Sequence, residues 1–325
     1  MPTQTIPLLP VDEVRVTIVM DNSFDFLLPS TSVARRVRLG PSPFTHLQPR
    51  AEHGLSALLT TRLGERTGRV LFDTGVSPDG ILRNLDVMEI DPRDFQAVVL
   101  SHGHADHANG LEGLAQRMGE RNLPLLLHPD AYLERKIVLP NGHETLLPPP
   151  RKSDLRAAGV EVIDERGPSM LVDGTVLISG EVARVTDFER GLPTHQALRG
   201  GEWQPDPLIH DDQCAIMHVR GKGLVIVTGC GHAGIVNIVR NAQAITGVEA
   251  VHAIIGGFHL SGPLFEPIIE PTIAALAGFA PEVLVPGHCT GWKATHAIAA
   301  AMPDAFIPTA VGTDFRMVAD APADA

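Results

Sequence analysis

The sequence predicts a layered α/β domain with mixed sheets and with its working loops gathered along one edge. A short apolar strand, a glycine-containing turn and a helix follow one another repeatedly, and several of these turns carry histidine. Hairpin patterns in the first half add antiparallel strand pairs to the parallel pairs that strand–turn–helix units produce. Because the histidine-bearing turns extend from residue 102 to residue 288, we expect a single domain over residues 1–318.

The first half of the chain is typical of strands and hairpins. Residues 14–19 alternate apolar and polar side chains and then reach Asp21 and Asn22, which is the pattern of a strand that enters a polar loop. Two apolar runs around GERTG predict a hairpin over residues 56–75, with Asp73 at the end of its second strand. The next strand, FQAVVL, leads into SHGHADHANG, and NGLEGLAQRMGE then has helical spacing.

The second half predicts three further strand–turn–helix units. Their strands and turns are GLVIVTGCGHAG, VHAIIGGFHL and EVLVPGHCTGW, and each is followed by an apolar helical pattern. Loop insertions are expected near residues 24–50, 121–155 and 188–213, because prolines interrupt the second and the third has no regular pattern. Such segments commonly cover a site. We expect residues 319–325 to be a disordered tail.

Composition argues for a small-molecule partner. The formal net charge of the 325 residues is -12, so the average field repels nucleic acids and anionic membranes. The densest basic cluster, ARRVR, is typical of a solvated loop. Three scattered cysteines give no disulfide framework, no leader is apparent, and no apolar run reaches the ~18 residues of a membrane span. These observations predict a cytoplasmic protein.

The segment SHGHADHANG predicts a metal site. His102 and His104 lie two residues apart, so both face the same side of an extended segment, while Asp106 and His107 lie just beyond on the turn. Imidazole suits zinc, iron, nickel and copper. The added carboxylate, without a cage of thiolates, favours a catalytic site over a closed structural one.

HGHADH is similar to the H-x-H-x-D-H motif of the metallo-β-lactamase-fold hydrolases, and VLFDTG resembles the strand with a supporting aspartate in that superfamily. DNSFD, EHGLSALL, VTGCGHAGI, IGGFHL and PGHCTGW together resemble the branch named for a dihydropterin-methyl-ribofuranosylaminobenzene phosphate synthase. The resemblance extends over residues 14–315. It implies a four-layered αββα sandwich of two mixed β-sheets flanked by helices, with one or two divalent metal ions at the sheet edge.

The resemblance also implies which side chains bind the ions, with zinc as the expected metal and iron or manganese as the other candidates. The first set is His102, His104 and His232, and the second set is Asp106, His107 and His288. Relatives usually carry a bridging aspartate where this sequence has His259 in IGGFHL. A neutral imidazole has one free lone pair and cannot bridge two ions, so the sequence leaves open whether one or two ions bind.

Several other residues have two interpretations. Cys230, two residues before His232, is either a metal ligand that replaces the missing carboxylate or a small buried apolar residue. Asp73 either orients a ligand histidine or caps its own turn. Asn22, His53 and His195 are expected to face the substrate from neighbouring loops.

The resulting functional prediction is metal-dependent hydrolysis of a small or medium anionic substrate with a phosphoester, lactone or thioester bond. Asp106 would orient and deprotonate the attacking water, and His259 would donate a hydrogen bond to the developing oxyanion. One alternative is a transferase that joins a dihydropterin to a ribofuranosylaminobenzene phosphate. Another is a non-catalytic metal-binding or regulatory module, because one fold hosts many functions.

Overall fold

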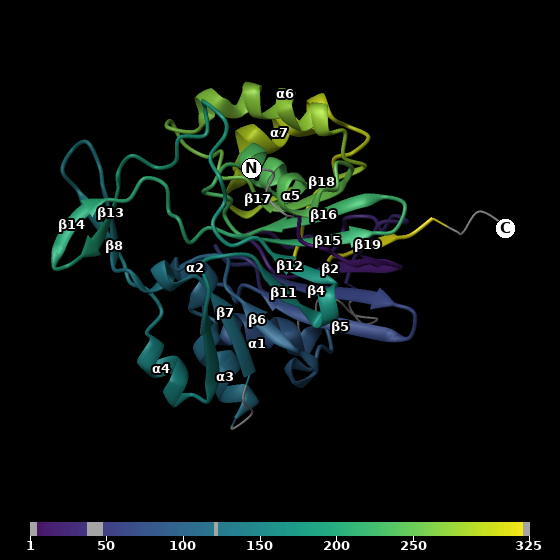
Figure 1. Cartoon of the computed structure of the whole chain (residues 1–325), viewed down its shortest axis with the longest axis horizontal. Coiled ribbons are helices and arrows are strands. Elements are labelled where there is room, and N and C mark those ends of the chain that lie inside the picture. The colour runs from purple at the N-terminus through teal and green to yellow at the C-terminus, as the bar shows by residue number, and fades with distance from the viewer. Residues whose placement is uncertain (1–4, 38–47, 120–122, 321–325) are drawn as a thin grey trace.

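The computed structural model describes residues 5–37, 48–119 and 123–320. Two large β-sheets stack face to face, and helices cover the outer face of each (Figure 1). This arrangement confirms the predicted four-layered sandwich with two mixed sheets. No helix in the described ranges is long and apolar enough to cross a membrane.

One large sheet comes mainly from the second half of the chain. Strands β15 to β18 lie side by side in it, where β15 and β16 are antiparallel and β16, β17 and β18 are parallel. Helices α5 (Ile235–Thr246), α6 (Ile269–Phe279) and α7 (Trp292–Ala301) cover its outer face. Its strands are, in spatial order, β11 (Ser169–Leu171), β12 (Val176–Ile178), β15 (Cys214–Val219), β16 (Gly223–Thr228), β17 (Val251–Gly257) and β18 (Val283–Gly287), with β1 (Pro10–Val11) beside β15.

The other large sheet comes mainly from the first half and includes the predicted hairpin of β4 and β5. Helices α1 (Pro78–Val87) and α3 (Leu111–Met118) pack on its outer face, with α4 (Lys152–Ala157) beside them. Its strands are, in spatial order, β10 (Val160–Asp164), β7 (Leu123–Leu127), β6 (Ala97–Val99), β5 (Arg66–Phe72), β4 (Ser56–Leu63), β2 (Glu13–Met20), β19 (Asp314–Val318) and β3 (Ala34–Arg35).

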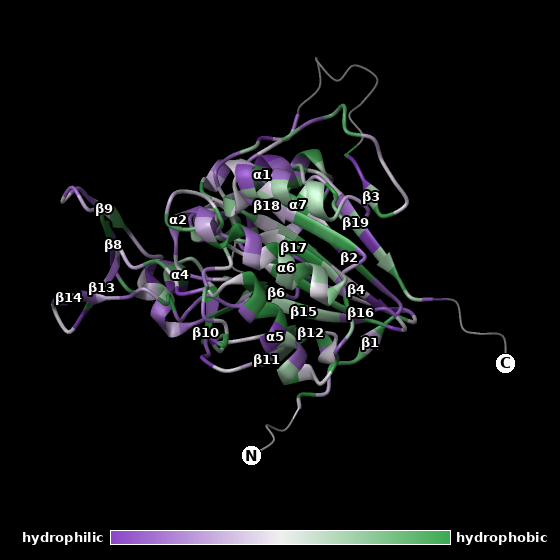
Figure 2. Ribbon diagram, turned by 90° about the horizontal axis from the view of Figure 1, so that it is seen from above, coloured by the Kyte–Doolittle hydropathy of each residue, from purple (hydrophilic) through white to green (hydrophobic). Residues whose placement is uncertain are grey.

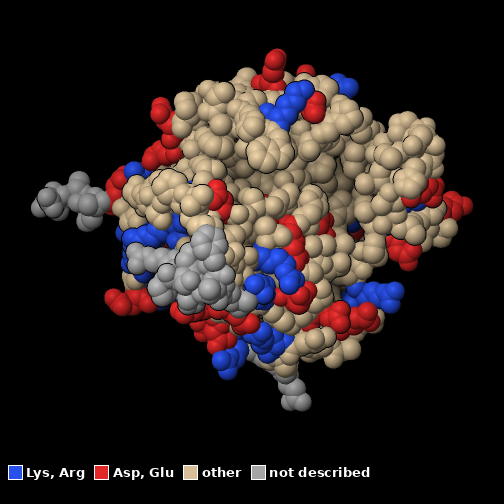
Figure 3. Space-filling model, turned by 180° about the vertical axis from the view of Figure 1, so that it is seen from behind, with Lys and Arg blue, Asp and Glu red and all other residues tan. Residues whose placement is uncertain are grey.

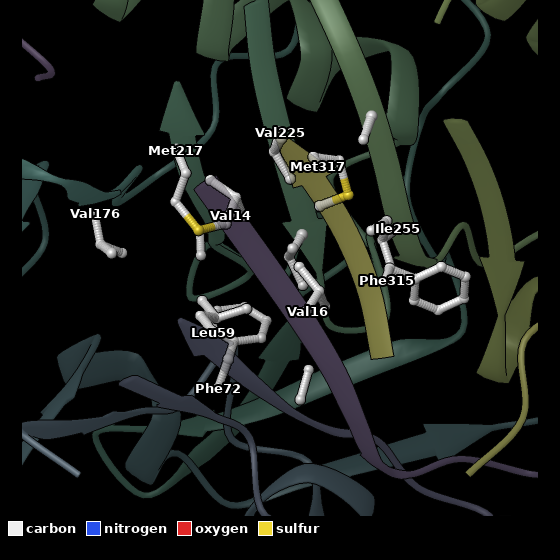
Figure 4. Close-up of a cluster of buried hydrophobic side chains, with 14 of the residues drawn as sticks. Val14, Val16, Leu59, Phe72, Val176, Met217, Val225, Ile255, Phe315 and Met317 are labelled. Atoms are coloured by element: carbon white, nitrogen blue, oxygen red, sulfur yellow. The ribbon is translucent and has the colours of Figure 1, made fainter. Parts of the chain in front are cut away.

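The core between the sheets follows from the two-residue period of the strands. Val14 and Val16 of β2 point into it, together with Phe72 of β5 and Phe315 of β19 (Figure 4). Val19 points the other way, toward the helices. Because both of its faces are covered, the sheet of the second half has strands such as β16 and β18 that are nearly continuous apolar runs. Strand β2 of the other sheet alternates apolar and polar residues.

A smaller antiparallel sheet projects from the sandwich and is called the arm below (Figures 1 and 2). It contains β14 (Glu202–Pro205), β13 (His195–Arg199), β8 (Arg135–Val138) and β9 (Glu144–Leu147), in that order. The expectation of irregular insertions over 121–155 and 188–213 is therefore wrong in part. The two segments pair with each other through β8 and β13, a long-range contact that local patterns do not reveal.

Other predicted segments are only partly described. The insertion near 24–50 contains the short strand β3, and its residues 38–47 lie outside the described ranges. The same is true of residues 321–325 of the predicted tail and of residues 121 and 122. The prediction of a single domain over 1–318 stays a prediction.

Candidate metal centre

The candidate ligands follow the carboxyl ends of strands from both large sheets. The segment with His102 follows β6, while His232, His259 and His288 follow β16, β17 and β18 in turn. Since β16, β17 and β18 are parallel, their carboxyl ends meet at one edge, which is where open α/β sheets bind ligands. The two sheets bring their loops together at this edge.

The first cluster consists of His102, His104 and His232, whose ligand atoms all lie within 4.8 Å of one another. His104 Nδ1 is 3.2 Å from His232 Nε2. His102 Nδ1 contacts Ser101 Oγ at 2.9 Å, whereas its buried Nε2 has no hydrogen-bond partner among the described residues. Burial holds the pKa values of His102 and His232 well below their ordinary value and lowers the pKa of His104 to about 3. Neutral imidazoles with a free lone pair are the form that binds metal.

The second cluster consists of Asp106, His107, Cys230 and His288. Cys230 Sγ lies 3.2 Å from His107 Nε2 and 3.4 Å from His288 Nε2. His288 Nε2 is 3.3 Å from Asp106 Oδ2. Although burial favours the neutral acid, His107 and His288 keep the pKa of Asp106 well below its ordinary value. This geometry favours the interpretation of Cys230 as a ligand over that of a merely apolar residue.

Together these donors fit divalent transition ions. The first cluster offers three imidazoles, and the second offers a carboxylate, two imidazoles and a thiol, which are ligands that zinc and related ions accept. The His102 and His107 rings are 4.3 Å apart between centroids, so the clusters adjoin. Burial raises the pKa of the Cys230 thiol, so metal binding there would release a proton.

His259 belongs to neither of these clusters. Its ring lies 4.2 Å from the ring of His232, and its ligand atom groups with Cys230 and Cys289 within 4.8 Å. Its φ of 45° is in the left-handed region, and its Nδ1 is buried without a partner in the described part of the chain. The group that contains His259, at the position of the expected bridging aspartate, thus offers two thiols and no carboxylate.

Asp73 contacts a candidate ligand histidine, in line with the first of its two interpretations. Its Oδ2 is 2.7 Å from His107 Nδ1, and its carboxylate also accepts hydrogen bonds from the backbone N–H and the hydroxyl of Ser101. Ser101, which contacts both Asp73 and His102, is a site residue that the sequence reasoning missed. Its position directly before HGH was the available signal. A Cβ on Gly229 would stand 2.0 Å from Ser101 Oγ, so only glycine fits there.

His195 has a different role from the expected one. Its side chain is fully buried, and its Nε2 is 3.1 Å from His104 Nε2. The expectation that it faces the substrate is therefore wrong, because β13 packs this part of the arm directly behind the first cluster. Hydrogen bonds to the far nitrogen of a ligand histidine fix its orientation.

A buried ion network joins the arm to the ligand loop. Arg135 Nε donates to Asp206 Oδ2 at 3.0 Å, and Arg135 Nη1 donates to Asp211 Oδ2 at 3.0 Å. Asp211 Oδ2 also accepts a hydrogen bond from the backbone N–H of Gly103, between the two candidate ligands His102 and His104. Sequence reasoning missed this network because its members lie on three separate segments.

Asn22 and His53 line a pocket of about 570 Å³ that reaches His288. Asn22 Oδ1 is 3.2 Å from His288 Nδ1, and His53 Nε2 is 3.7 Å from Asp106 Oδ2. His53 is largely exposed. Both residues thus line a pocket beside the second cluster, and the expectation that they face a substrate stays a prediction.

Comparison with known proteins gives a consistent result. The sequence model of the metallo-beta-lactamase superfamily matches residues 53–124. The chain is 33% identical over 253 residues to the 7,8-dihydropterin-6-methyl-4-(beta-D-ribofuranosyl)-aminobenzene-5'-phosphate synthase of Methanocaldococcus jannaschii, covering 75% of this chain and 83% of that protein. It is 29% identical over 247 residues to an uncharacterized protein of the same organism, with 75% and 86% covered. A crystal structure described as a metal-dependent hydrolase of the beta-lactamase superfamily superposes with a TM-score of 0.70 at 24% identity, over 94% of this chain and all of that one.

Proposed function

The chain belongs to the metallo-β-lactamase superfamily, and from that premise we propose that it is a metal-dependent hydrolase of a small or medium anionic molecule. The candidate bonds are a phosphoester, a lactone and a thioester. The observation that carries the proposal is the pair of adjoining clusters at the sheet edge. The ligand atoms of each cluster lie within 4.8 Å of one another, and His288 of the second cluster lines a pocket.

In this proposal the first cluster holds one ion and the second cluster holds another, with zinc as the first candidate and iron or manganese as the others. Divalent ions in such sites supply positive charge, Lewis acidity and a lowered pKa for water, of about 7. The mixed donor set of Cys230, Asp106 and two imidazoles supports a transition metal over magnesium or calcium, which prefer oxygen ligands.

The side chains around the pocket would bind and orient the substrate. Asp106 Oδ2 lies 3.3 Å from Nε2 of His288, which lines the pocket, and its low pKa suits a role in holding a water molecule in line more than a role as a strong base. His259 also lines the pocket and has an unpartnered buried Nδ1 among the described residues. In this proposal it would donate a hydrogen bond to an oxygen that becomes negative.

The charge distribution supports a small anionic substrate and not a nucleic acid. The described residues that line the pocket include no lysine or arginine, so an anionic group would be neutralised at the metal centre. On the face shown in Figure 3, basic and acidic side chains are interspersed and form no broad basic area. The net charge of -12 also argues against a nucleic-acid substrate, because it repels the phosphate backbone.

The test is turnover by metal-loaded protein against a panel of phosphate esters, lactones and thioesters. We expect His104→Ala to abolish turnover and lose metal, because the first cluster keeps only two imidazoles. His143→Ala is the matched control, since His143 is exposed on the arm. Activity of His104→Ala within threefold of the parent protein would place the chemistry elsewhere.

A transferase is the second candidate, and the 33% identity to the synthase favours it. Incubation with a dihydropterin and a ribofuranosylaminobenzene phosphate, followed by mass spectrometry, would detect the joined product. If the joined product forms and no phosphate ester, lactone or thioester is hydrolysed, the transferase would replace the hydrolase as the proposed function. Metal binding without turnover in either assay would indicate a non-catalytic module.

A further inference from the structure

Trp292 is the most exposed large hydrophobic side chain of the described residues, at 81%. It also lines the pocket that reaches His288. Exposed aromatic side chains at the rim of a pocket are a common means of binding flat ligands, because the ring offers a large apolar face at little conformational cost.

The turn before α7 and a neighbouring histidine determine the position of the Trp292 ring. Helix α7 begins at Trp292, directly after Gly291, whose φ of 82° favours glycine and whose missing Cβ would lie 2.7 Å from the Ser261 Cβ. One turn later, His296 packs edge-on against the indole, with 5.4 Å between ring centroids. The chain therefore turns tightly before α7 and holds the tryptophan at the pocket rim.

The neighbours of Trp292 identify the kind of ligand. Ser261, Thr295 and Thr309 line the same pocket together with Pro286 and Pro308, so hydroxyl groups and apolar rings share the pocket wall with the indole. That mixture suits one flat ring with polar edges better than an acyl chain or a protein surface, which would need a wider apolar area.

We propose that Trp292 is a stacking platform for a planar aromatic or heteroaromatic ring of the substrate, while the anionic part of the same molecule reaches the metal centre. The inference rests on the proposed function for the anionic end and on the pocket for the ring. It names the substrate class: an anionic molecule that carries a flat polar ring. The ring would lie beyond His288 and Cys289, which line the pocket on the side of the second cluster.

The test is calorimetric binding of two ring probes, 7,8-dihydropterin and 4-aminobenzoate, with ribose 5-phosphate as a probe without an aromatic ring. Loss of aromatic stacking typically weakens binding roughly 5- to 150-fold. We expect a loss in that range for Trp292→Ala, a smaller loss for Trp292→Phe, and no change for ribose 5-phosphate. Trp203→Ala is the matched control, because Trp203 lies on β14 of the arm.

The two proposals can fail separately. A ring probe that binds the parent protein and Trp292→Ala within twofold of each other would overturn the stacking role, and so would the absence of binding by both ring probes at millimolar concentration. Loss of ring binding in Trp292→Ala, with no turnover in the hydrolase panel, would keep the platform and reject the hydrolase.

Discussion

Replacing Arg135 by methionine should destabilise the protein through the charges that it leaves behind. The Arg135 side chain is 1% exposed, and those of its partners Asp206 and Asp211 are 4% and 0% exposed. Methionine has a similar length but no donor, so two buried carboxylates would lose the guanidinium. Asp211 would keep the Gly103 N–H, and Asp206 would keep Arg199 at 3.2 Å.

The expected cost follows from these remaining contacts. Removing one partner of a buried ion pair typically costs about 3–5 kcal/mol. Because each carboxylate keeps one donor, we expect the lower end, about 3 kcal/mol. With a urea dependence of about 3 kcal/mol per molar, the midpoint of unfolding should fall by roughly 1 M.

The loss should also depend on pH with a definite sign. Although burial opposes ionisation, Arg135 keeps the pKa of Asp211 below its ordinary value, and it acts on Asp206 in the same way. A carboxylate with a lowered pKa stabilises the fold above the pKa of the unfolded chain, about 4, and this stabilisation is lost as the pH falls. The difference between Arg135→Met and the parent should thus be complete at pH 7 and shrink below about pH 4.

Urea unfolding of metal-free protein, followed by far-ultraviolet circular dichroism, measures this effect without a contribution from bound ions. Arg166→Met is the control: Arg166 pairs with Asp130 and Glu181, but its own side chain is 55% exposed, so its loss should cost under about 1 kcal/mol. Arg135→Met/Asp211→Asn should recover part of the loss. Stability of Arg135→Met within 1 kcal/mol of the parent, or a loss that does not vary with pH, would refute the reasoning.

Three further predictions concern the site. Cys230→Ala should lower the metal content by about one equivalent in a metal titration, because the second cluster loses its thiol, whereas an unchanged content would exclude Cys230 as a ligand. His195→Phe should weaken metal affinity about 10- to 100-fold by freeing His104 Nε2, with near-parental circular dichroism, and parental affinity would contradict the orienting role. Asp212 accepts a hydrogen bond from the Ala233 backbone N–H, next to His232, and burial raises its pKa to about 6. Stability therefore falls as the pH rises from about 4, the pKa in the unfolded chain, to about 6, and the loss is constant above that. Asp212→Asn should therefore raise the urea midpoint more at pH 8 than at pH 5, and an equal gain at both would oppose this.

The sequence predicted those parts of the molecule that local patterns encode. The apolar patterns of three regions predicted elements that the structure contains. These regions are the strand before His102, the β4–β5 hairpin and the three late strand–turn–helix units. The grouping of His232 with His102 and His104 came from the resemblance, and the structure places these side chains together. Local pattern and tertiary structure agree there because both faces of each strand pack on a core.

The remaining parts depend on contacts between distant segments. The arm forms because Arg135, Lys136 and Ile137 pair with a strand about 60 residues later, and neither strand is recognisable alone. His195 lies on β13, and Asp211 joins Arg135 on β8 to the backbone of Gly103, so both contacts with the loop of His102 involve distant segments. Sequence spacing could not distinguish a histidine that faces a substrate from one that lies behind a ligand.

The sequence also did not reveal the backbone conformation at the site, which shows how the fold positions the candidate ligands. His288 has a φ of 48°, which is unfavourable for a residue with a Cβ. Its backbone N–H donates to Asp21, and its carbonyl accepts a hydrogen bond from Asn22, so the segment after β2 in one sheet holds a candidate ligand that follows β18 in the other. Local strain of this kind persists only when the surroundings fix it. Because folding sets this geometry through contacts between the two sheets, the second cluster needs little rearrangement to bind an ion, and substitutions at Asp21 or Asn22 should weaken metal binding without removing any ligand.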